Sequence, residues 1–452
     1  MAEGEGGNLM SVGSTSEGNA FTEVASLREG LDRRPRTGQE SALDTVPSPD
    51  PKWRVLIAHP GRQHSHQAAL ALHEVGYLHC YATGIPVSKR QFGRLAQQAL
   101  KRYSVHDELD IPLQLTRLNM ITPIVHRLLA RNLPEHVGSP LLYETYRLFD
   151  KWVAKLVAQQ QPHAVIAYEA SASYTFEAAR KVGAACILDA AALHRIEADQ
   201  RFQGRLPRAY KRVVDRRKDT EIALADCIFT TSNLAAQSYL ANVPSSVRIR
   251  SIALGADIDR FKPAVEKVGS VSELQPFCFI FVGTATHLKG FDLLIEALEQ
   301  LIDEKLSFNM VLVGDVDASL LRGHPRVIEM ISQHGRVGQT ELASILRSAD
   351  CLILPSRFDS FGMVVPEAMA CGLPVIVSDM VGAKELVADG RNGFIVPAEN
   401  ISALVTRMRW MIHNRRFSRE MSLEARAAAE QASWACYRRR FVAAVRELLL
   451  SR

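Results

Sequence analysis

The sequence lacks any paired cysteine pattern, which argues against a disulfide scaffold. Its seven cysteines are odd in number and scattered, and no two of them have CxxC spacing. Several, such as Cys351, lie in apolar runs. This placement is typical of buried free thiols in a reducing compartment.

Long apolar runs and a strong charge imbalance are also absent. No run approaches the roughly 20 residues that a membrane-spanning helix needs, and residues 1–50, rich in Gly, Ser, Glu and Thr, show no secretory leader. With 54 basic and 49 acidic residues, the net charge of +5 gives no argument for nucleic acid, although it suits an anionic membrane surface or anionic substrates. We therefore expect a cytoplasmic protein, with peripheral docking on the inner face of the cytoplasmic membrane as an open alternative.

Length and composition predict two domains behind a disordered N-terminal segment. A chain of 452 residues, 47% of them hydrophobic, is too long for one domain of ordinary size. Residues 1–50 have little aromatic or branched content and cannot bury enough apolar surface to offset the entropy of ordering. Short continuous apolar runs then alternate with helical stretches, a pattern typical of a parallel sheet covered on both faces.

The apolar runs form two series. The first predicts an N-terminal domain over 51–262, with strands at 53–59, 164–168, 186–189 and 227–230. The second predicts a C-terminal domain over 263–433, with strands at 277–282, 309–313, 351–354, 374–377 and 393–396. The basic amphipathic stretch at 434–452 is expected to pack back on the N-terminal domain. The expected fold is α/β, with two Rossmann-like doubly wound domains facing a cleft, because ligands bind beyond the carboxyl ends of such strands.

The most informative segment, Leu354 to Asp379, combines two carboxylates with a glycine at a strand-to-helix turn. Asp359 lies in the turn, and we expect Glu367 about two turns along the helix, so that both can point into one groove. Gly362 lets a ligand approach the backbone closely, and the start of the helix favours a phosphate. Since carboxylate oxygens accept hydrogen bonds from hydroxyl groups, one can hold a sugar ring and the other a ribose.

This segment resembles the donor-binding signature of the retaining, GT-B-fold glycosyltransferases of family four. That signature has two acidic residues separated by seven others, followed by Ala-Met-Ala-x-Gly-x-Pro-Val. The resemblance extends to residues 281–297, 382–393 and 254–263, and it is strong over roughly 225–400. Ordinary α/β packing can explain one such motif, but four in the right order make that explanation rare. The resemblance implies a nucleotide-diphosphate-sugar donor bound by the C-terminal domain and an acceptor bound by the N-terminal domain.

The resemblance also implies the donor site, which comprises Gly61, Thr284, Lys289, Asp359, Phe361, Gly362, Met363 and Glu367. Asp359 and Lys289 are further expected to act in catalysis. Two positions depart from the family pattern, since Asp359 replaces the usual Glu and Thr284 replaces an Arg that normally helps to hold the diphosphate. Arg357 or Arg336 is a candidate to compensate.

The acceptor-side candidates are Arg62 and His64 in the turn after the first strand, Glu169 after the second and Asp189 at the end of the third. Doubly wound sheets place ligand-contacting residues at these strand ends. Many relatives have a His near the position of Asp189 to His194 that contacts the transferred sugar, and we choose His194 as the catalytic residue on this side. Helix capping by Ser65 and its neighbours is the plainer interpretation of the first turn.

Two patterns suggest a metal, and we reject both. His59, His64 and His66 crowd together, but no acidic or Cys partner has ligand spacing nearby. Asp257-Ile-Asp259 is a DxD, yet it lies in a segment that resembles the inter-domain connection of this family, where Asp257 is expected to cap or pair. We therefore expect no metal and no cofactor, with Lys289 and helix N-termini stabilising the departing diphosphate.

The resemblance implies a retaining hexosyl- or related glycosyltransferase, which we expect to be metal-independent. It also suggests a saccharide or lipid-linked saccharide as the acceptor, in surface-polysaccharide synthesis. The alternatives are a nucleotide-sugar epimerase of the same fold and a non-catalytic degenerate homologue. Basic clusters at 88–90, 101–102 and 205–218 predict a surface that rests on an anionic leaflet, with a solvated helix face as the alternative.

Overall fold

The computed structural model describes residues 53–61, 63–85, 111–120, 133–201, 207–264 and 275–452. The segment 1–50, Arg62, the basic clusters at 88–90 and 101–102, and the first two residues of the third cluster lie outside the described residues. The described chain forms two parallel sheets, one of seven strands and one of six, with helices between the strands. The prediction of an α/β fold with two doubly wound sheets is confirmed.

The first sheet has the strand order β3-β2-β1-β4-β5-β6-β7. Its strands are β1 (Val55–His59), β2 (Leu78–Thr83), β3 (Thr116–Leu118), β4 (Ala164–Tyr168), β5 (Ala185–Ala190), β6 (Cys227–Thr230) and β7 (Arg248–Ser251). Its helices are α2 (Ser65–Glu74), α5 (Glu135–Gln160), α6 (Ser173–Lys181), α7 (Arg195–Arg201), α8 (Arg208–Leu224) and α9 (Asn233–Leu240), with a short 3-10 turn, η2 (Leu113–Leu115).

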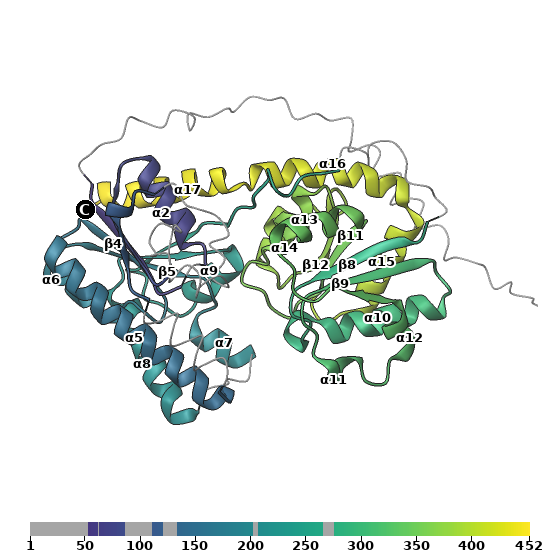
Figure 1. The fold of residues 1–452 in the computed structure, drawn as a ribbon, viewed down its shortest axis with the longest axis horizontal. Helices are drawn as coiled ribbons and strands as arrows, with labels where there is room; N and C mark the ends of the chain where they lie inside the picture. Colours follow the sequence, from purple (N-terminus) through teal and green to yellow (C-terminus); the bar gives the residue numbers. More distant parts are fainter. Residues whose placement is uncertain (1–52, 62, 86–110, 121–132, 202–206, 265–274) are drawn as a thin grey trace, which may run out of the picture. The chain divides into compact units, whose positions relative to one another are not determined.

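Both faces of this sheet are buried, which explains the continuous apolar runs. Along β1, Val55 and Ile57 pack into one core with Leu72 of α2. The intervening Leu56 packs into a second core with Phe149 of α5. Alternate side chains of a strand point to opposite faces, so a strand covered on both sides needs apolar residues at every position. The helices α5, α6 and α8 lie together along the sheet (Figure 1).

The second sheet has the order β10-β9-β8-β11-β12-β13. Its strands are β8 (Phe277–Val282), β9 (Phe308–Val313), β10 (Ile331–Gln333), β11 (Cys351–Leu354), β12 (Val375–Ser378) and β13 (Gly393–Val396). Its helices are α10 (Phe291–Asp303), α11 (Ala318–Leu321), α12 (Pro325–Met330), α13 (Gln339–Ser348), α14 (Val364–Ala370), α15 (Ile401–His413) and α16 (Arg415–Gln431), with 3-10 turns η5 (His287–Lys289) and η6 (Gly382–Leu386).

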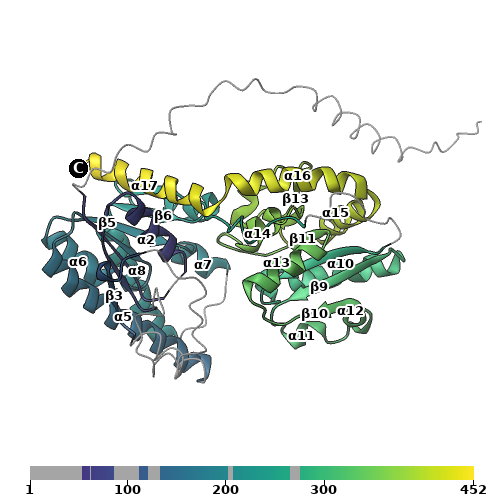
Figure 2. The same cartoon turned by 45° about the horizontal axis from the view of Figure 1, so that its top comes forward.

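The last helix, α17 (Trp434–Leu450), packs against α2 of the first sheet, and both views show it beside that helix (Figure 1, Figure 2). Arg438 donates a hydrogen bond to Glu74 at 3.0 Å. The ring of Phe441 lies 5.6 Å from the ring of Phe229 in β6. Within the described ranges, no helix combines the length and the apolar character needed to cross a bilayer.

Candidate active site

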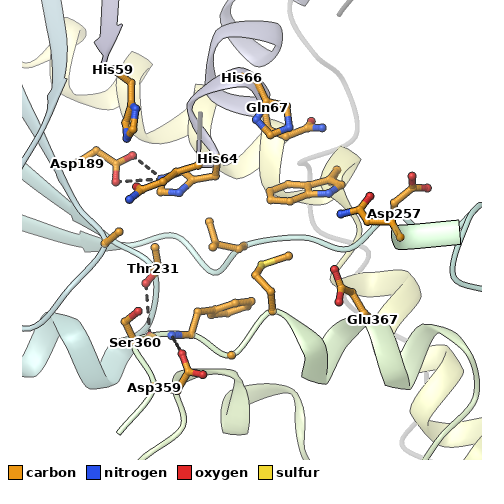
Figure 3. A pocket seen from close by; sticks show the side chains of 18 of the residues that line it. His59, His64, His66, Gln67, Asp189, Thr231, Asp257, Asp359, Ser360 and Glu367 are labelled. Carbon is orange, nitrogen blue, oxygen red and sulfur yellow. Dashed lines mark hydrogen bonds and ion pairs between the residues drawn. The ribbon is translucent and has the colours of Figure 1, made fainter. Parts of the chain in front are cut away.

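A pocket of about 1370 Å³ is lined by loops that follow strands of both sheets. Figure 3 shows His59, His64 and Asp189 along one wall and Asp359 and Ser360 along another. Of the residues predicted from the sequence, it brings together His64, Glu169, Asp189, Asp359, Phe361, Gly362, Met363 and Glu367. Among the described residues, the lining does not include Gly61, His194, Thr284 or Lys289.

An imidazole–carboxylate pair lies at one wall of the pocket. His64 Nε2 is 2.9 Å from Asp189 Oδ2 and 3.1 Å from Asp189 Oδ1, and both side chains are buried. His64 directly precedes α2, and Asp189 is the fifth residue of β5. A carboxylate held against an imidazole fixes its ring orientation and its tautomer. The pair is therefore a rigid polar element at the carboxyl edge of the first sheet.

His59 ends β1 beside this pair. Its Nδ1 accepts a hydrogen bond from the backbone N–H of Gly61 at 2.7 Å. Burial, with a smaller contribution from His64, lowers the pKa of His59 to about 4. A neutral imidazole whose Nδ1 accepts carries its proton on Nε2, so His59 can donate a hydrogen bond there.

The capping interpretation of Ser65 is wrong. Helix α2 has no side-chain cap at its first turn, and the Ser65 hydroxyl instead bonds the Tyr81 hydroxyl at 2.8 Å. Serine at the start of a helix commonly caps it, but here a buried tyrosine of the neighbouring strand competes for the hydroxyl.

In the described part of the chain, no group of three or more His, Cys, Asp or Glu residues is placed to hold a metal ion.

Glu169 follows β4 and pairs with Lys218 of α8 at 3.0 Å. Burial alone would lower the pKa of Lys218, but the Glu169 carboxylate raises it above its usual value. The next residues are held by Glu221, whose carboxyl accepts the backbone N–H groups of Ala170 at 2.8 Å and Ala172 at 3.0 Å. Glu169 is therefore presented to the pocket by an anchored loop.

His194 lies apart from the pocket lining. Its side chain is buried, its ring centroid is 5.3 Å from that of Tyr239, and its backbone N–H donates to Ser238 Oγ at 2.9 Å. Burial, and after it the neighbouring Arg195, lowers the pKa of His194. Its predicted contact with the transferred sugar stays a prediction.

On the donor side, Lys289 Nζ pairs with Asp359 Oδ2 at 2.5 Å. Asp359 Oδ1 also accepts the backbone N–H of Phe361 at 3.3 Å. Gly362 has a φ of +86°, and an added Cβ would lie 2.9 Å from Val381, so the turn needs glycine. The predicted diphosphate cation and the first acidic residue of the signature therefore neutralise each other in this structure.

Glu367 is the fourth residue of α14, so it stands in the first turn and not two turns along, as the sequence pattern suggested. The helix begins only at Val364, because the preceding glycine has a left-handed conformation. Burial raises the pKa of Glu367 to about 8, with Arg260 opposing the rise and Asp257 adding to it. Asp257 itself accepts the Arg260 backbone N–H at 3.1 Å, which is the pairing expected of it.

The two candidates to replace the missing family arginine have other partners. Arg357 makes a bidentate contact with Asp292, 2.7 Å to each oxygen, and donates to Glu399 at 2.8 Å. Arg336 pairs with Asp315 at 2.6 Å, and both side chains are mostly exposed. Thr284 is exposed at its own position.

Several lining residues were missed by the sequence patterns, among them Thr231, Arg260, Gln339 and Trp434. Thr231 directly follows β6, and the rule that ligands bind beyond strand ends would have found it. Arg260 lies within residues 254–263, a segment whose family resemblance gives this arginine no role. Trp434 begins a helix that only tertiary packing brings to the pocket, so no local signal marks it.

Comparison with known protein families places residues 266–428 under the family model described as glycosyl transferases group 1. An uncharacterised glycosyltransferase of Methanocaldococcus jannaschii is 31% identical over 161 residues, which cover 34% of this chain and 44% of that protein. The D-inositol 3-phosphate glycosyltransferase of Streptomyces avermitilis is 28% identical over 231 residues, covering 47% of this chain and 50% of that protein. The chain thus spans about half the length of these curated relatives.

Solved structures share the whole fold. Sucrose-phosphate synthase from Thermosynechococcus elongatus superimposes with a TM-score of 0.65 at 17% identity, over 89% of this chain and 100% of that one. The Anabaena protein HepE, solved in complex with UDP, has a TM-score of 0.59 at 15% identity, over 87% of this chain and 100% of that one. At these identities the likeness shows the fold alone.

Proposed function

We propose that this chain, which has the GT-B fold and whose residues 266–428 match the family model of glycosyl transferases group 1, transfers a sugar from a nucleotide-diphosphate-sugar to a hydroxyl acceptor. The observation that carries the proposal is the pocket itself. One part of its lining comes from the acidic signature after β11, with Asp359 and Glu367. Another part comes from the polar strand ends of the first sheet, with His64 and Asp189.

The donor binds to the second sheet in this proposal. A diphosphate brings negative charge to Lys289, which then exchanges its contact with Asp359 for a phosphate oxygen. Asp359 is thereby released to accept hydrogen bonds from the sugar, and Glu367 holds the ribose hydroxyls. Because Arg357 is engaged by Asp292 and Glu399, Lys289 carries the main electrostatic burden at the diphosphate.

The acceptor binds against the first sheet, where His64, Glu169 and Asp189 line the pocket. Carboxylate and imidazole groups suit hydroxyl-rich ligands, since they accept or donate single hydrogen bonds. His194 and Arg62 remain proposed participants on this side.

The proposed chemistry retains the anomeric configuration. The acceptor oxygen forms its bond to the anomeric carbon on the face from which the diphosphate leaves with the bonding electron pair. The acceptor proton passes to an oxygen of that leaving phosphate. Such a step needs positioning and charge stabilisation, which Lys289 can supply without a metal.

We further propose that a saccharide or lipid-linked saccharide is the acceptor, in surface-polysaccharide synthesis, and that the protein docks peripherally on the inner face of the cytoplasmic membrane. Support comes from α8, where Arg208, Arg212 and Arg216 are exposed. A basic helix face is attracted to anionic lipids. Docking there would bring a lipid-linked acceptor to the first sheet.

A ligand screen tests the proposal. Purified protein is heated with UDP-, GDP- and ADP-sugars, and a bound donor raises the melting temperature. The Anabaena protein HepE is also solved with UDP-glucose, so uridine donors come first. Stabilisation followed by transfer to a saccharide supports the proposal. Conversion to another nucleotide sugar without an acceptor identifies an epimerase, and binding without turnover identifies a degenerate homologue.

A further inference from the structure

The donor signature contacts the segment that follows β6 through the backbone carbonyl of Ser360. Ser232 is the second residue after β6, next to Thr231, and its hydroxyl donates to the backbone carbonyl of Ser360 at 2.6 Å. The Thr231 hydroxyl reaches the same carbonyl at 3.4 Å. The Ser232 Oγ also accepts the backbone N–H of Ala235 and so caps α9. One hydroxyl therefore joins the start of a first-sheet helix to the residue beside Asp359.

The backbone carbonyls of Asp359, Ser360 and Phe361 accept hydrogen bonds from two different parts of the chain. The Asp359 carbonyl accepts the N–H of Gly382 at 2.9 Å, and the Phe361 carbonyl accepts the N–H of Ala383 at 2.6 Å. Both of those N–H groups belong to η6, which follows β12, and the signature follows β11 of the same sheet. The carbonyl between them, at Ser360, is held by Ser232 of the other sheet. Ser232 thus fixes the peptide plane that leads into Phe361.

Close packing makes the contact between Ser232 and the Ser360 carbonyl sensitive to small changes in position. A Cβ added at Gly382 would lie 2.2 Å from the Ser360 carbonyl oxygen and 2.7 Å from Ser232 Oγ. No side chain fits where these three segments meet. Any displacement of Ser232 is therefore transmitted to the backbone of the signature.

Glu385 makes a second contact three residues beyond Gly382. Its carboxylate accepts the backbone N–H of Asn233, the first residue of α9, at 2.5 Å. The Glu385 side chain is exposed, although partial burial of its carboxyl raises its pKa. The turn η6 therefore binds both the donor signature, through Ala383, and the start of α9, through Glu385. We call Ser232 and Glu385 the clasp.

We propose that the clasp is a donor-positioning device: Ser232 and Glu385 hold the backbone of Asp359–Phe361 in the conformation that binds the nucleotide-diphosphate part of the donor. Neither residue lines the described pocket, so each acts through the signature and not by touching the ligand. The inference rests on the proposed function, because it takes a nucleotide sugar as the ligand of this pocket. It predicts that donor affinity depends on a serine and a glutamate outside the site.

Isothermal titration of the full chain with UDP, GDP and ADP tests the clasp. For the nucleotide that binds the wild type best, Ser232→Ala should weaken binding about fivefold, the effect of one neutral hydrogen bond. Ser238→Ala is the matched control, because its buried hydroxyl lies in the same helix and bonds His194 N and Ala235 O, both in the first sheet's half of the chain. It should lower the melting temperature similarly and leave nucleotide affinity within about twofold.

Glu385 supplies an independent variant. Glu385→Ala should also weaken binding, by no more than the roughly fivefold loss in Ser232→Ala, because the Glu385 side chain is exposed and Ser232 is buried. Glu385→Gln, which keeps an acceptor oxygen for Asn233, should restore most of the affinity. Should Ser232→Ala fail to fold, this pair makes the same test. Equal affinity in wild type, Ser232→Ala and Glu385→Ala overturns the clasp, as does an equal loss in Ser238→Ala. If the wild type binds none of the three nucleotides, the proposed function fails, and the clasp fails with it.

Discussion

The two sheets share a strand order and differ in the side chains at their carboxyl ends. Counted from its own first strand, each sheet runs third, second, first, fourth, fifth, sixth, and the first sheet adds one more strand at its edge. The second sheet places a Lys–carboxylate pair, Lys289 with Asp359, beyond two neighbouring strands. The first places an imidazole–carboxylate pair, His64 with Asp189. The same framework thus offers a cation for a charged ligand in one half and hydroxyl-binding groups in the other.

The strongest test of this division removes the carboxylate of the first sheet. Asp189→Asn weakens the support of the buried His64 ring, and an acceptor hydroxyl displaced by as little as an ångström loses about hundredfold in transfer rate. Nucleotide affinity should stay within about twofold, measured by titration. Asp219→Asn, which removes an exposed ion pair with Arg195 in the same half, is the control. A matching loss of nucleotide affinity in Asp189→Asn would end the division of labour between the sheets.

Membrane docking should also distinguish the two halves, because it should depend on basic residues of the first half and not on those of the second. The double variant Arg212→Glu, Arg216→Glu reverses two exposed charges on α8. At ~1 kcal/mol per basic residue, it should reduce binding to anionic vesicles about thirtyfold at low salt. Vesicle flotation measures this, and high salt should release the wild type. Arg322→Glu, Arg416→Glu makes the same charge change in the second half and should float like the wild type. Wild type that never floats refutes the docking and leaves the transferase proposal standing.

Removing the positive charge of Lys289 in the second half should weaken binding of the donor. Lys289→Ala removes a charge-assisted contact worth ~1.5–3 kcal/mol, so nucleotide binding and turnover should weaken at least about tenfold. Circular dichroism should show an unchanged fold. The control is Arg391→Ala, whose ion pair with Glu424 is exposed. Wild-type turnover in Lys289→Ala would remove this residue from the site.

The pH dependence of nucleotide affinity should report on Glu367. Burial raises the pKa of this carboxyl to about 8 in the free protein, so it is protonated at neutral pH. If ribose hydroxyls prefer the carboxylate, binding releases the proton, and affinity rises with pH up to about pH 8, by at most about tenfold per unit. Above that pH the gain stops. Glu367→Gln should flatten the curve, while the titration of the nucleotide itself contributes equally to both proteins.

The smallest expected effect is that of chelation. Because Lys289 is proposed to stabilise the diphosphate, exhaustive treatment with EDTA should leave the transfer rate unchanged within error. Loss of activity that Mn²⁺ or Mg²⁺ restores would return Asp257 and Asp259 to consideration as ligands. Asp257→Asn would then be expected to abolish the metal response.

The sequence predicts most of the strands whose faces are both buried, but it misses the buried strand β2, whose sequence Leu-His-Cys-Tyr-Ala-Thr is not a continuous apolar run. The bounds of Cys351–Leu354 and Gly393–Val396 match the structure, because continuous apolar runs mark such strands. It misses β7, whose residues alternate between exposed and half-buried and include Arg248 and Arg250. It also misses β3 and β10, edge strands of three residues each. Edge strands can be short and polar, so their composition resembles that of loops.

The candidate site likewise has a part that the sequence predicts and a part that it misses. The signature from Asp359 to Glu367 is contiguous, so its chemistry is visible in one segment of sequence. The pairing of His64 with Asp189 joins residues 125 positions apart, and only the strand order brings them together. The family resemblance proposed His194, whose side chain is buried and is not among the residues that line the pocket, and its role stays a prediction. The prediction of the site was therefore limited by the separation of its residues along the chain and not by their types.

The packing of α17 on α2 has a consequence for biosynthesis. The apolar surface around Phe229 is complete long before a ribosome reaches Phe441, which covers it. At roughly 5–20 residues per second, the nascent first sheet waits on the order of ten seconds or more for its last helix. During that interval it exposes a patch that chaperones recognise and that other nascent chains can capture. Truncation before Trp434 would make this transient exposure permanent, so such chains should collect in the insoluble fraction of cells.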